Sequence, residues 1–414
     1  MDEGLLIPLD GLIEQYAPNI QKMFEERPDI KKSITATDGH IYCLPNVSAP
    51  ITYVTSFWYN GDWLKNMNIT EEQLPDTLDG YYELMKRFQT EDPNGNGIAD
   101  EQPMCFASTG EAADVNVYIL PAFGIANARF YAEDGEIKFG MLHPNWVEFV
   151  KYVNKLYDEK IIDNDWYTME ASARVAKGNS NLIGIANTSL PQAIWDVNDP
   201  EIAKTYLLAP PLRSEYTKNE PWVREAATGI RKGAFSITNK CKNPEAMIRY
   251  ADYLYSEEGS LFIHYGKEGG LWEYTPEKLM RYIMPEDGRT VEEYRSGVVT
   301  PDSGTWVPKW VRPETEGNWD DAFQQYRVRV LDEKLIPYIR QGLPQMYFTS
   351  EEQAQADMLL LDIQKYCDEM EAKFFVGDSD IEKDYAKFTQ ELKALGIDEM
   401  LALYQTAYQR WLDA

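Results

Sequence analysis

Residues 234–255 read AFSITNKCKNPEAMIRYADYLY, and this stretch combines both kinds of regular structure. The run Ala234–Thr238 is short and holds aromatic and β-branched residues, which predicts a β-strand. Asn243 and Pro244 then supply a helix N-cap and a proline at the first helical position. The apolar face that follows comprises Met247, Tyr250, Ala251, Leu254 and Tyr255. A strand followed by an amphipathic helix is typical of an α/β protein.

The same alternation of short apolar runs and amphipathic helices continues along the chain. Further strand candidates are Ile41–Leu44, Ile51–Tyr59, Leu182–Ala186 and Tyr206–Ala209. A second helical stripe comprises Trp146, Phe149, Val150, Val153 and Tyr157. The last ~65 residues read as wholly helical by the same spacing, and their first stripe comprises Ala354, Met358, Leu361 and the Lys365–Cys367 stretch. We therefore predict an α/β fold with a helix-rich C-terminal part.

Length and composition narrow the class of protein. With 414 residues, the chain is too long for one ordinary core, which predicts two lobes. A formal net charge of −28 argues against nucleic acid as a partner, because such a surface repels phosphate backbones. The sequence contains no apolar run of roughly 18 residues, so it predicts no membrane span. The 11 Trp and 27 Tyr favour surfaces that stack and form hydrogen bonds, as sugar sites do, although large Trp residues also fill cores.

Cysteine and histidine spacing argues against a zinc site. Cys43, Cys105, Cys241 and Cys367 are widely spread and form no CxxC pair. They are compatible with either free thiols or disulfides, and we expect free thiols. The three histidines form no HExxH motif, which disfavours zinc catalysis.

The sharpest local motif is residues 92–101, DPNGNGIADE. Oxygen-bearing side chains fall at positions 1, 3, 5 and 9 of a calcium-loop template, and the carbonyl of Ile98 falls at position 7. Gly97 occupies position 6, where such a loop turns sharply. We expect a structural Ca²⁺ held by Asp92, Asn94, Asn96, Ile98, Asp100 and Glu101.

The loop departs from an EF-hand at position 12, where Pro103 stands in place of a bidentate Glu. Asp100 and Glu101 would therefore have to close the shell. The alternative interpretation is an Asn-Gly turn with solvated acidic residues.

Several stretches together resemble one known family. They are Leu5–Leu9, Ala17–Ile20, Asp38–Pro45, Tyr59–Leu64, Thr77–Phe88 with the loop after it, Asn243–Ala246, Asp252–Ser256, Leu395–Glu399 and Tyr404–Tyr408. In this order they resemble the extracellular solute-binding proteins of carbohydrate ABC importers. Within family 1, the match is to the large lipoprotein-type branch that includes alginate-oligosaccharide-binding proteins. Relative to that family, the chain looks N-terminally shortened, without the lipoprotein signal and the first strands.

This resemblance implies a two-lobed, class II periplasmic-binding-protein-like fold. It implies an N-terminal lobe of residues 1–107 and 234–300 and a C-terminal lobe of residues 108–233 and 301–414. It also implies a function: capture of an oligosaccharide by hinge closure, delivery to the membrane subunits of an ABC importer, and no chemistry on the sugar. We expect a monomer outside the cytoplasm, periplasmic or anchored through a lipoprotein N-terminus absent from this chain.

Aromatic residues are the candidates for the ligand cleft, because indole and phenol rings stack on the C–H face of a sugar. Trp272 and Tyr274 follow a glycine-rich loop that resembles one near the family's ligand. Trp58 follows a strand, and the others lie after strands or in irregular stretches, where function often resides. The complete set of candidates is Trp58, Trp195, Trp222, Trp272, Tyr274, Trp306 and Trp310.

Other readings of the sequence stay open. A glycoside hydrolase or lyase would need two carboxylates set ~5–9 Å apart in a cleft. A calcium-dependent adhesion module would need a repeated loop, and only one loop occurs. The same fold could also bind a peptide. The acidic total disfavours uronic oligomers, yet Arg213, Arg224 and Arg231 could form a local anion site.

Overall fold

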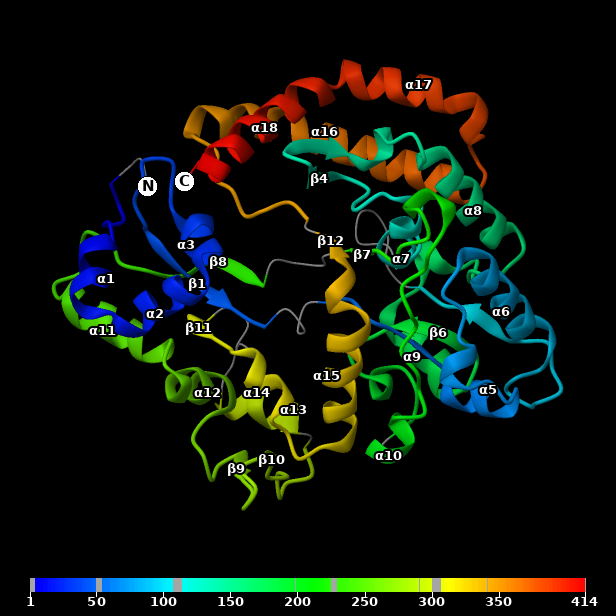
Figure 1. Cartoon of the computed structure of the whole chain (residues 1–414), viewed down its shortest axis with the longest axis horizontal. Coiled ribbons are helices and arrows are strands. Elements are labelled where there is room, and N and C mark those ends of the chain that lie inside the picture. Colours follow the sequence, from blue (N-terminus) through cyan, green and yellow to red (C-terminus); the bar gives the residue numbers. More distant parts are fainter. Residues whose placement is uncertain are drawn as a thin grey trace.

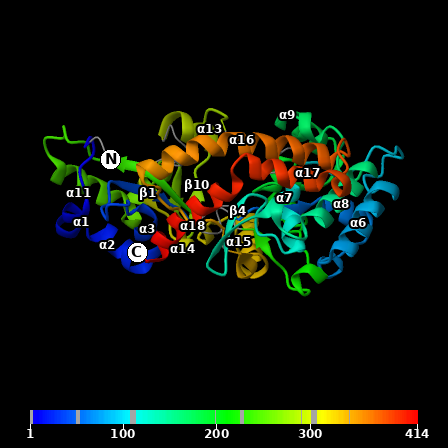
Figure 2. The same ribbon diagram turned by 90° about the horizontal axis from the view of Figure 1, so that it is seen from above.

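The computed structural model describes residues 4–49, 54–106, 114–197, 199–224, 229–289, 291–299, 307–340 and 342–413. Two α/β lobes lie side by side in both ribbon views (Figure 1, Figure 2). We call them the first lobe (described residues within 4–49 and 229–317) and the second lobe (described residues within 54–224 and 322–413). The two-lobed α/β fold predicted from the sequence is confirmed. Within the described residues, no helix is both long and apolar enough to cross a membrane.

The first lobe is built around a three-stranded sheet in the order β11-β1-β8. β1 (Cys43–Val47) pairs antiparallel with β8 (Ile230–Ser236) and parallel with β11 (Lys309–Trp310). The remaining elements of this lobe are α1 (Asp10–Tyr16), α2 (Pro18–Glu26), α3 (Pro28–Ile34), α11 (Pro244–Leu254), α12 (Glu257–Tyr265), β9 (Trp272–Tyr274), β10 (Met280–Tyr282), α13 (Val291–Tyr294) and α14 (Pro313–Gly317). Leu44, Val47 and Ile248 are buried together in this lobe's core.

The second lobe is built around a sheet in the order β2-β6-β3. β6 (Ile183–Asn187) pairs antiparallel with β2 (Phe57–Tyr59) and parallel with β3 (Gln102–Met104). A Cβ at Gly184 would lie 2.7 Å from the Trp63 ring, so only glycine lets helix α5 (Gly61–Asn66) pack this closely on the central strand.

Further helices and strands enclose this second sheet. They are α6 (Leu78–Thr90), α7 (Asp114–Tyr118), β4 (Phe130–Glu133), β5 (Glu136–Phe139), α8 (Trp146–Asp158), α9 (Ala171–Asn179), α10 (Pro200–Ala203), β7 (Val223–Arg224), α15 (Ala322–Lys334), β12 (Ile339–Arg340), α16 (Ser350–Phe375), α17 (Ile381–Ala394) and α18 (Ile397–Asp413). The predicted strand Tyr206–Ala209 forms only an isolated bridge, between Leu208 and Trp58.

The lobe boundary that strand pairing indicates differs from the boundary expected at residue 107. β2 and β3 both pair with β6, so residues 57–104 belong to the sheet of the second lobe. After residue 300, β11 and α14 lie with the first lobe rather than with the second (Figure 1). Sequence resemblance indicated that the chain crosses between lobes, but pairing partners decide where it crosses.

The helical C-terminal part is confirmed, but its first predicted apolar stripe is only partly right. Helices α16, α17 and α18 cover most of residues 350–413. Met358 and Leu361 are 71% and 70% exposed. The buried face of α16 runs through Ile363, Cys367 and Phe374, of which Cys367 was predicted. Helix α16 packs against α8 and α18.

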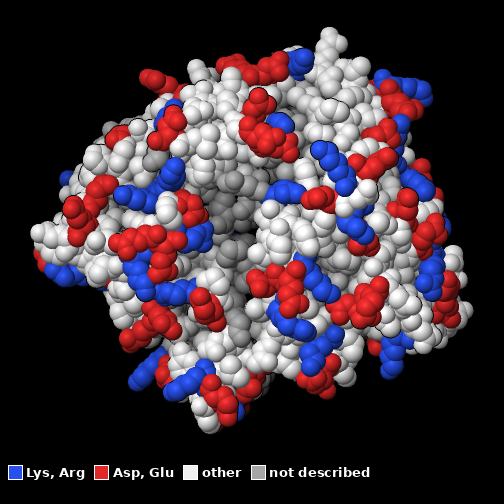
Figure 3. Space-filling model, viewed as in Figure 1, with Lys and Arg blue, Asp and Glu red and all other residues white. Residues whose placement is uncertain are grey.

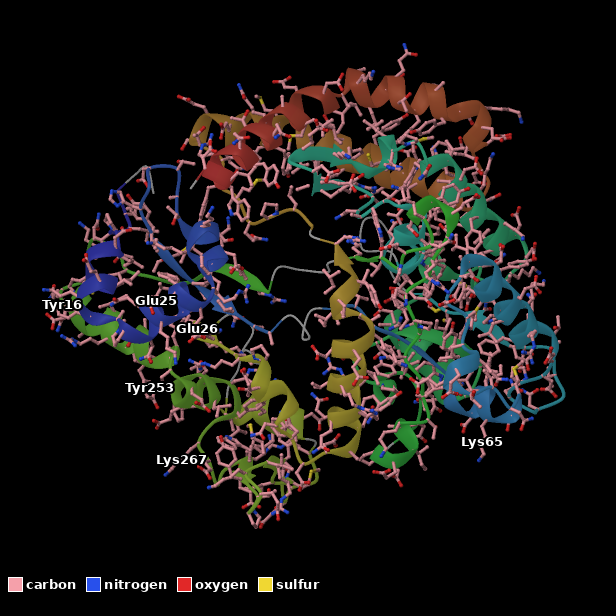
Figure 4. All side chains as sticks on the ribbon, viewed as in Figure 1. Tyr16, Glu25, Glu26, Lys65, Tyr253 and Lys267 are labelled. Atoms are coloured by element: carbon pink, nitrogen blue, oxygen red, sulfur yellow. The ribbon has the colours of Figure 1, made fainter. Side chains whose placement is uncertain are left out.

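Helix α11 shows the same kind of difference. Asn243 caps it as predicted, accepting a hydrogen bond from the Ala246 amide at 3.1 Å. Met247 and Tyr250 of the predicted face are exposed. Asp252 is buried instead, and its carboxylate accepts hydrogen bonds from the Ile20 amide at 2.9 Å and from Asn19 Nδ2 at 2.8 Å. This polar anchor fixes the rotation of α11, so Tyr253 lies on the outside of the first lobe (Figure 4).

A buried ion pair connects α16 to the rest of the second lobe. Arg129 and Glu371 are 5% and 1% exposed, and their side chains meet at 2.7 Å. Glu371 also accepts a hydrogen bond from the buried Asn116 side chain. Burial alone would lower the pKa of Arg129, but the adjacent Glu371 carboxylate holds it above its ordinary value. The four cysteines are free thiols, as expected from the sequence.

We predict that Arg129→Met lowers the free energy of unfolding by about 3–5 kcal/mol, because it leaves the Glu371 charge buried without its partner. Arg87→Met is the matched control, since the Arg87–Glu91 pair is exposed and contributes at most ~1 kcal/mol. Urea denaturation of both variants measures the difference. Equal losses in the two variants would contradict the prediction.

Candidate functional site

The surface is hollowed between the two lobes (Figure 3). A groove of about 790 Å³ lies between the α3–β1 connection of the first lobe and the end of α18 in the second, and we call it the inter-lobe groove. The first lobe lines it with Lys32, Thr35, Thr37 and neighbouring residues of the α3–β1 connection. The second lobe lines it with Tyr347 and with residues of the last turns of α18, namely Gln405, Thr406, Ala407, Gln409, Arg410, Trp411 and Asp413. A molecule in this groove would therefore touch both lobes at once.

Helix α18 presents different chemistry on its two faces. Met400, Ala407 and Tyr408 are buried toward the second lobe. Gln405 and Gln409, one turn apart, line the groove with Trp411 beyond them. This amphipathic spacing packs α18 on its own lobe. Gln405 also binds that lobe, because its side chain accepts from the Ile137 amide at 2.7 Å and donates to the Gly135 carbonyl at 3.1 Å. Trp411 lies beside Lys32 of the other lobe.

Arg410 holds the second-lobe wall in place. Its Nη2 donates to Glu352 Oε1 at 2.5 Å, and its Nη1 donates to the Tyr347 carbonyl at 3.1 Å. Glu352 belongs to the capping box that Thr349 forms at the start of α16. The end of α18, the start of α16 and the segment that carries Tyr347 are therefore tied together.

The first-lobe wall reaches across to α18. Ala36 donates to the His40 carbonyl at 2.8 Å, and Gly39 adopts φ +85° to close the turn. The Lys32 ammonium lies 5.6 Å from the centre of the Trp411 ring and donates to the Leu412 carbonyl at 3.4 Å. The end of α18 lies beside α3 in both ribbon views (Figure 1, Figure 2).

The groove is lined mainly by neutral polar groups. Glutamine amides, threonine hydroxyls, one lysine and one arginine offer donors and acceptors around two aromatic rings. Asp413 is the single carboxylate among the lining residues that the structure describes. A pair of carboxylates, which glycoside hydrolysis requires, is therefore not present among these lining residues.

Three of the aromatic residues predicted to bind ligand lie in hydrophobic cores. Trp58 is fully buried, and its Nε1 donates to the Thr188 carbonyl at 3.0 Å. Trp195 donates to the Ile183 carbonyl at 3.2 Å, and Trp272 donates to the Gly266 carbonyl at 3.0 Å. Their indole N–H groups are thus satisfied by backbone, and in this conformation none of the three exposes a ring face.

The other predicted aromatics lie outside the inter-lobe groove. Tyr274 and Trp310 line a separate hollow of about 640 Å³ within the first lobe, where the Arg312 guanidinium lies 4.1 Å from the Trp310 ring centre. Trp222 precedes β7 and is covered by the Arg340 guanidinium at 4.7 Å. Trp306 lies outside the described residues.

The arginines considered as an anion site are separated by their surroundings. Arg213 pairs with Asp76 at 2.6 Å, Arg224 is buried in β7 of the second lobe, and Arg231 lies on β8 of the first lobe.

Sequence reasoning missed Trp411 and Tyr347, the two aromatic residues of the groove. Trp411 occurs at helical spacing, and such spacing usually marks a packed face. Tyr347 lies in the irregular stretch 342–349, which contains Pro344 and two adjacent aromatic residues. A long irregular stretch between two helices was the available signal for Tyr347.

The predicted calcium loop follows α6 on the surface of the second lobe. Asp92 accepts hydrogen bonds from the Asn96 amide and the Gly97 amide, both at 3.1 Å. The side-chain amides of Asn94 and Asn96 contact Asp100 at 3.1 Å and 3.0 Å. Gly97 has φ +75°, as the sharp turn requires. The oxygen-bearing side chains of the loop thus converge.

Glu101 supplies a second observation at this loop. Its Oε1 atom is buried without a hydrogen-bond partner. Burial, together with the charges of Asp100 and Asp92, raises its pKa. Within the described residues, no three His, Cys, Asp or Glu side chains cluster tightly enough to hold a metal alone. A cation here would depend on Asn oxygens and carbonyls as well, which are ligands that Ca²⁺ accepts.

Comparison with known proteins adds a family match. The family model for bacterial extracellular solute-binding proteins matches residues 1–260. The fructooligosaccharide ABC transporter substrate-binding protein FusA of Streptococcus pneumoniae is 25% identical over 426 residues, which cover 99% of this chain and 77% of that protein.

Solved structures share the fold. The FusA EF-hand mutant of S. pneumoniae in complex with fructo-nystose has a TM-score of 0.78 at 24% identity, covering 100% of this chain and 85% of that chain. An HMO-binding, ABC-transporter-associated solute-binding protein from Bifidobacterium longum infantis has a TM-score of 0.79 at 21% identity, covering 99% and 84%.

Burial separates the roles of two tryptophans. We predict that Trp58→Ala lowers the free energy of unfolding by about 3–5 kcal/mol, because it empties a fully buried site. Trp222→Ala should cost much less, because Trp222 is only partly buried. Thermal and urea denaturation of the two variants test this, and a mild effect at Trp58 would contradict its place in the core.

Proposed function

Because this chain belongs to the bacterial extracellular solute-binding proteins, we propose that it captures an oligosaccharide between its lobes and delivers it to an ABC importer. The single observation that carries the proposal is the inter-lobe groove, to which both lobes contribute side chains. A ligand that touches both walls binds the closed arrangement more tightly than an open one. Binding then shifts the population toward closure, which is how two-lobed receptors commonly respond to ligands.

The chemistry of the groove favours a largely neutral sugar. Trp411 and Tyr347 offer rings for the C–H face of a pyranose or furanose, while Gln409 and Thr37 offer partners for hydroxyls. The formal net charge of −28 disfavours a polyanionic chain. The ligand named for FusA, a fructooligosaccharide, belongs to this neutral class.

We propose that the protein performs no chemistry on its ligand. The groove lining offers one carboxylate among the described residues, whereas hydrolysis of a glycosidic bond needs two. Binding energy would then be used to move the lobes. We further propose that it acts outside the cytoplasm as a monomer and docks on the importer's membrane subunits.

A structural Ca²⁺ at residues 92–101 is part of the proposal. Asp92, Asn94, Asn96, Asp100 and Glu101 would supply side-chain oxygens, and Ile98 a carbonyl. The unpartnered Glu101 oxygen and its raised pKa support this, since a cation would satisfy both. The existence of an EF-hand mutant of FusA also supports it.

We predict that Trp411→Ala weakens oligosaccharide binding roughly 10- to 30-fold, because a buried aromatic contact of this kind is worth about 1.4–2 kcal/mol. The assay is isothermal titration with ligands from a thermal-shift screen of kestose, other neutral oligosaccharides and acidic oligogalacturonates.

Leu412→Ala is the matched control, since Leu412 is the next residue but does not line the groove. Unchanged affinity in Trp411→Ala, or product formation from a bound oligosaccharide, would contradict the proposed function.

We predict opposite effects of Glu101→Gln with and without Ca²⁺. In chelator, the substitution should raise the melting temperature, because it removes one of three neighbouring acidic charges. In Ca²⁺, it should lower the melting temperature, because it weakens a ligand. If chelator leaves the melting temperature of the unaltered protein unchanged, the loop holds no structural ion.

A further inference from the structure

Lys232 is a partly buried lysine at the junction of the two lobes. It lies on β8, the strand of the first lobe that follows the return of the chain from the second lobe. Its Nζ donates to the Met346 carbonyl at 2.9 Å and lies 3.7 Å from the centre of the Tyr347 ring. Among the described residues, no carboxylate pairs with it.

Withdrawing the Lys232 ammonium from water costs free energy unless the Tyr347 ring and the Met346 carbonyl compensate for the lost hydration. A lysine withdrawn from water without a carboxylate loses hydration that a weaker partner must replace. An aromatic face offers that partner through its negative quadrupole, and the attraction is strongest when water is excluded. The contact therefore holds the Tyr347 ring in a defined position over β8.

The position of Tyr347 in turn determines the position of the groove wall. Its hydroxyl contacts Cys43 Sγ on β1 at 3.5 Å, so the first lobe holds both the face and the end of the phenol. Its carbonyl accepts from Arg410, whose other nitrogen binds Glu352. Arg410 and Tyr347 both line the inter-lobe groove.

We propose that Lys232 is a positioning residue for the inter-lobe groove: by holding Tyr347, it attaches the second-lobe wall of the groove to the first lobe. We call this attachment the mooring. The inference rests on the proposed function for its ligand, but the mooring itself exists without ligand. Lys232 is not among the residues that line the groove, so its effect on binding passes through Tyr347 and Arg410.

The mooring links binding to pH with a defined sign. Burial lowers the pKa of Lys232 from 10.5 to about 8. Cys43 on β1 and Tyr347 on the moored segment are the titratable groups that face it, and burial raises the pKa of Tyr347, which keeps the phenol neutral. Because the moored state binds its proton more weakly, mooring is favoured as pH rises above about 8 toward the ordinary lysine value.

The first experiment needs no sugar. Trace acetylation with acetic anhydride, quantified by peptide mass spectrometry across pH, reports the titration of the Lys232 amine. We expect Lys232 to titrate near pH 8 in the unaltered protein. In Tyr347→Leu it should titrate near its ordinary value, because loss of the ring contact releases the segment that buries the amine. Tyr347→Phe should keep the low value, because it keeps the ring. An ordinary titration in the unaltered protein, or no change in Tyr347→Leu, overturns the proposal.

The second experiment measures kestose affinity by calorimetry between about pH 7 and pH 10. We expect Lys232→Met to weaken binding roughly 5- to 30-fold near neutral pH and to abolish the tightening above pH 8. Lys232→Arg should retain most of the affinity near neutral pH, where lysine is also charged, but should lose the tightening above pH 8, because arginine stays protonated. Unaltered affinity and pH dependence in Lys232→Met overturn the proposal. If kestose does not bind the unaltered protein, the assigned ligand fails, and the acetylation profile still decides the mooring.

Discussion

The packing of α18 on the second lobe, with its last turn against the first, is the contact on which the groove depends. Its buried face joins the largest core of the molecule, and its polar face reaches α3. A helix attached to one lobe and touching the other forms a wall whose position follows the angle between the lobes. Movement of the lobes therefore changes the groove directly. A ligand in the groove acts on the lobe arrangement without an additional segment between them.

Buried polar contacts, more than apolar area, determine which faces of α11 and α16 point toward the core. Asp252 fixes α11 by binding the amide of Ile20, and Glu371 fixes α16 by binding Arg129. Each anchor is buried, so rotation of its helix would leave a carboxylate without a partner at a cost of several kcal/mol. The same reasoning applies to Lys232, whose compensation comes from a ring and a carbonyl rather than from an opposite charge.

The sequence predicted the parts of the fold that depend on local chemistry. The cap at Asn243, the helical tail and the α/β class all follow from residue type and spacing within one element. The rotation of α11 and α16 could not be predicted, because Asp252 and Glu371 meet partners that lie 232 and 242 residues away. The lobe boundary differed for the same reason, since β3 and β6 pair across about eighty residues.

The functional residues were harder to predict than the fold. The predicted calcium loop is contiguous, so its spacing alone brings its oxygens together. The groove is assembled from α3, the Tyr347 segment and α18, and no spacing rule connects them. Trp58 and Trp195, predicted from residue type as sugar platforms, satisfy their N–H groups on backbone carbonyls inside the core.

The distribution of indoles has an optical consequence. Trp58, Trp63, Trp146, Trp166 and Trp195 are all enclosed in protein, so their fluorescence is emitted from apolar surroundings whatever fills the space between the lobes. Trp411 alone among the described tryptophans lines the inter-lobe groove. The enclosed indoles give a constant fluorescence background. Occupancy of the inter-lobe groove would therefore change the total fluorescence only slightly, through Trp411.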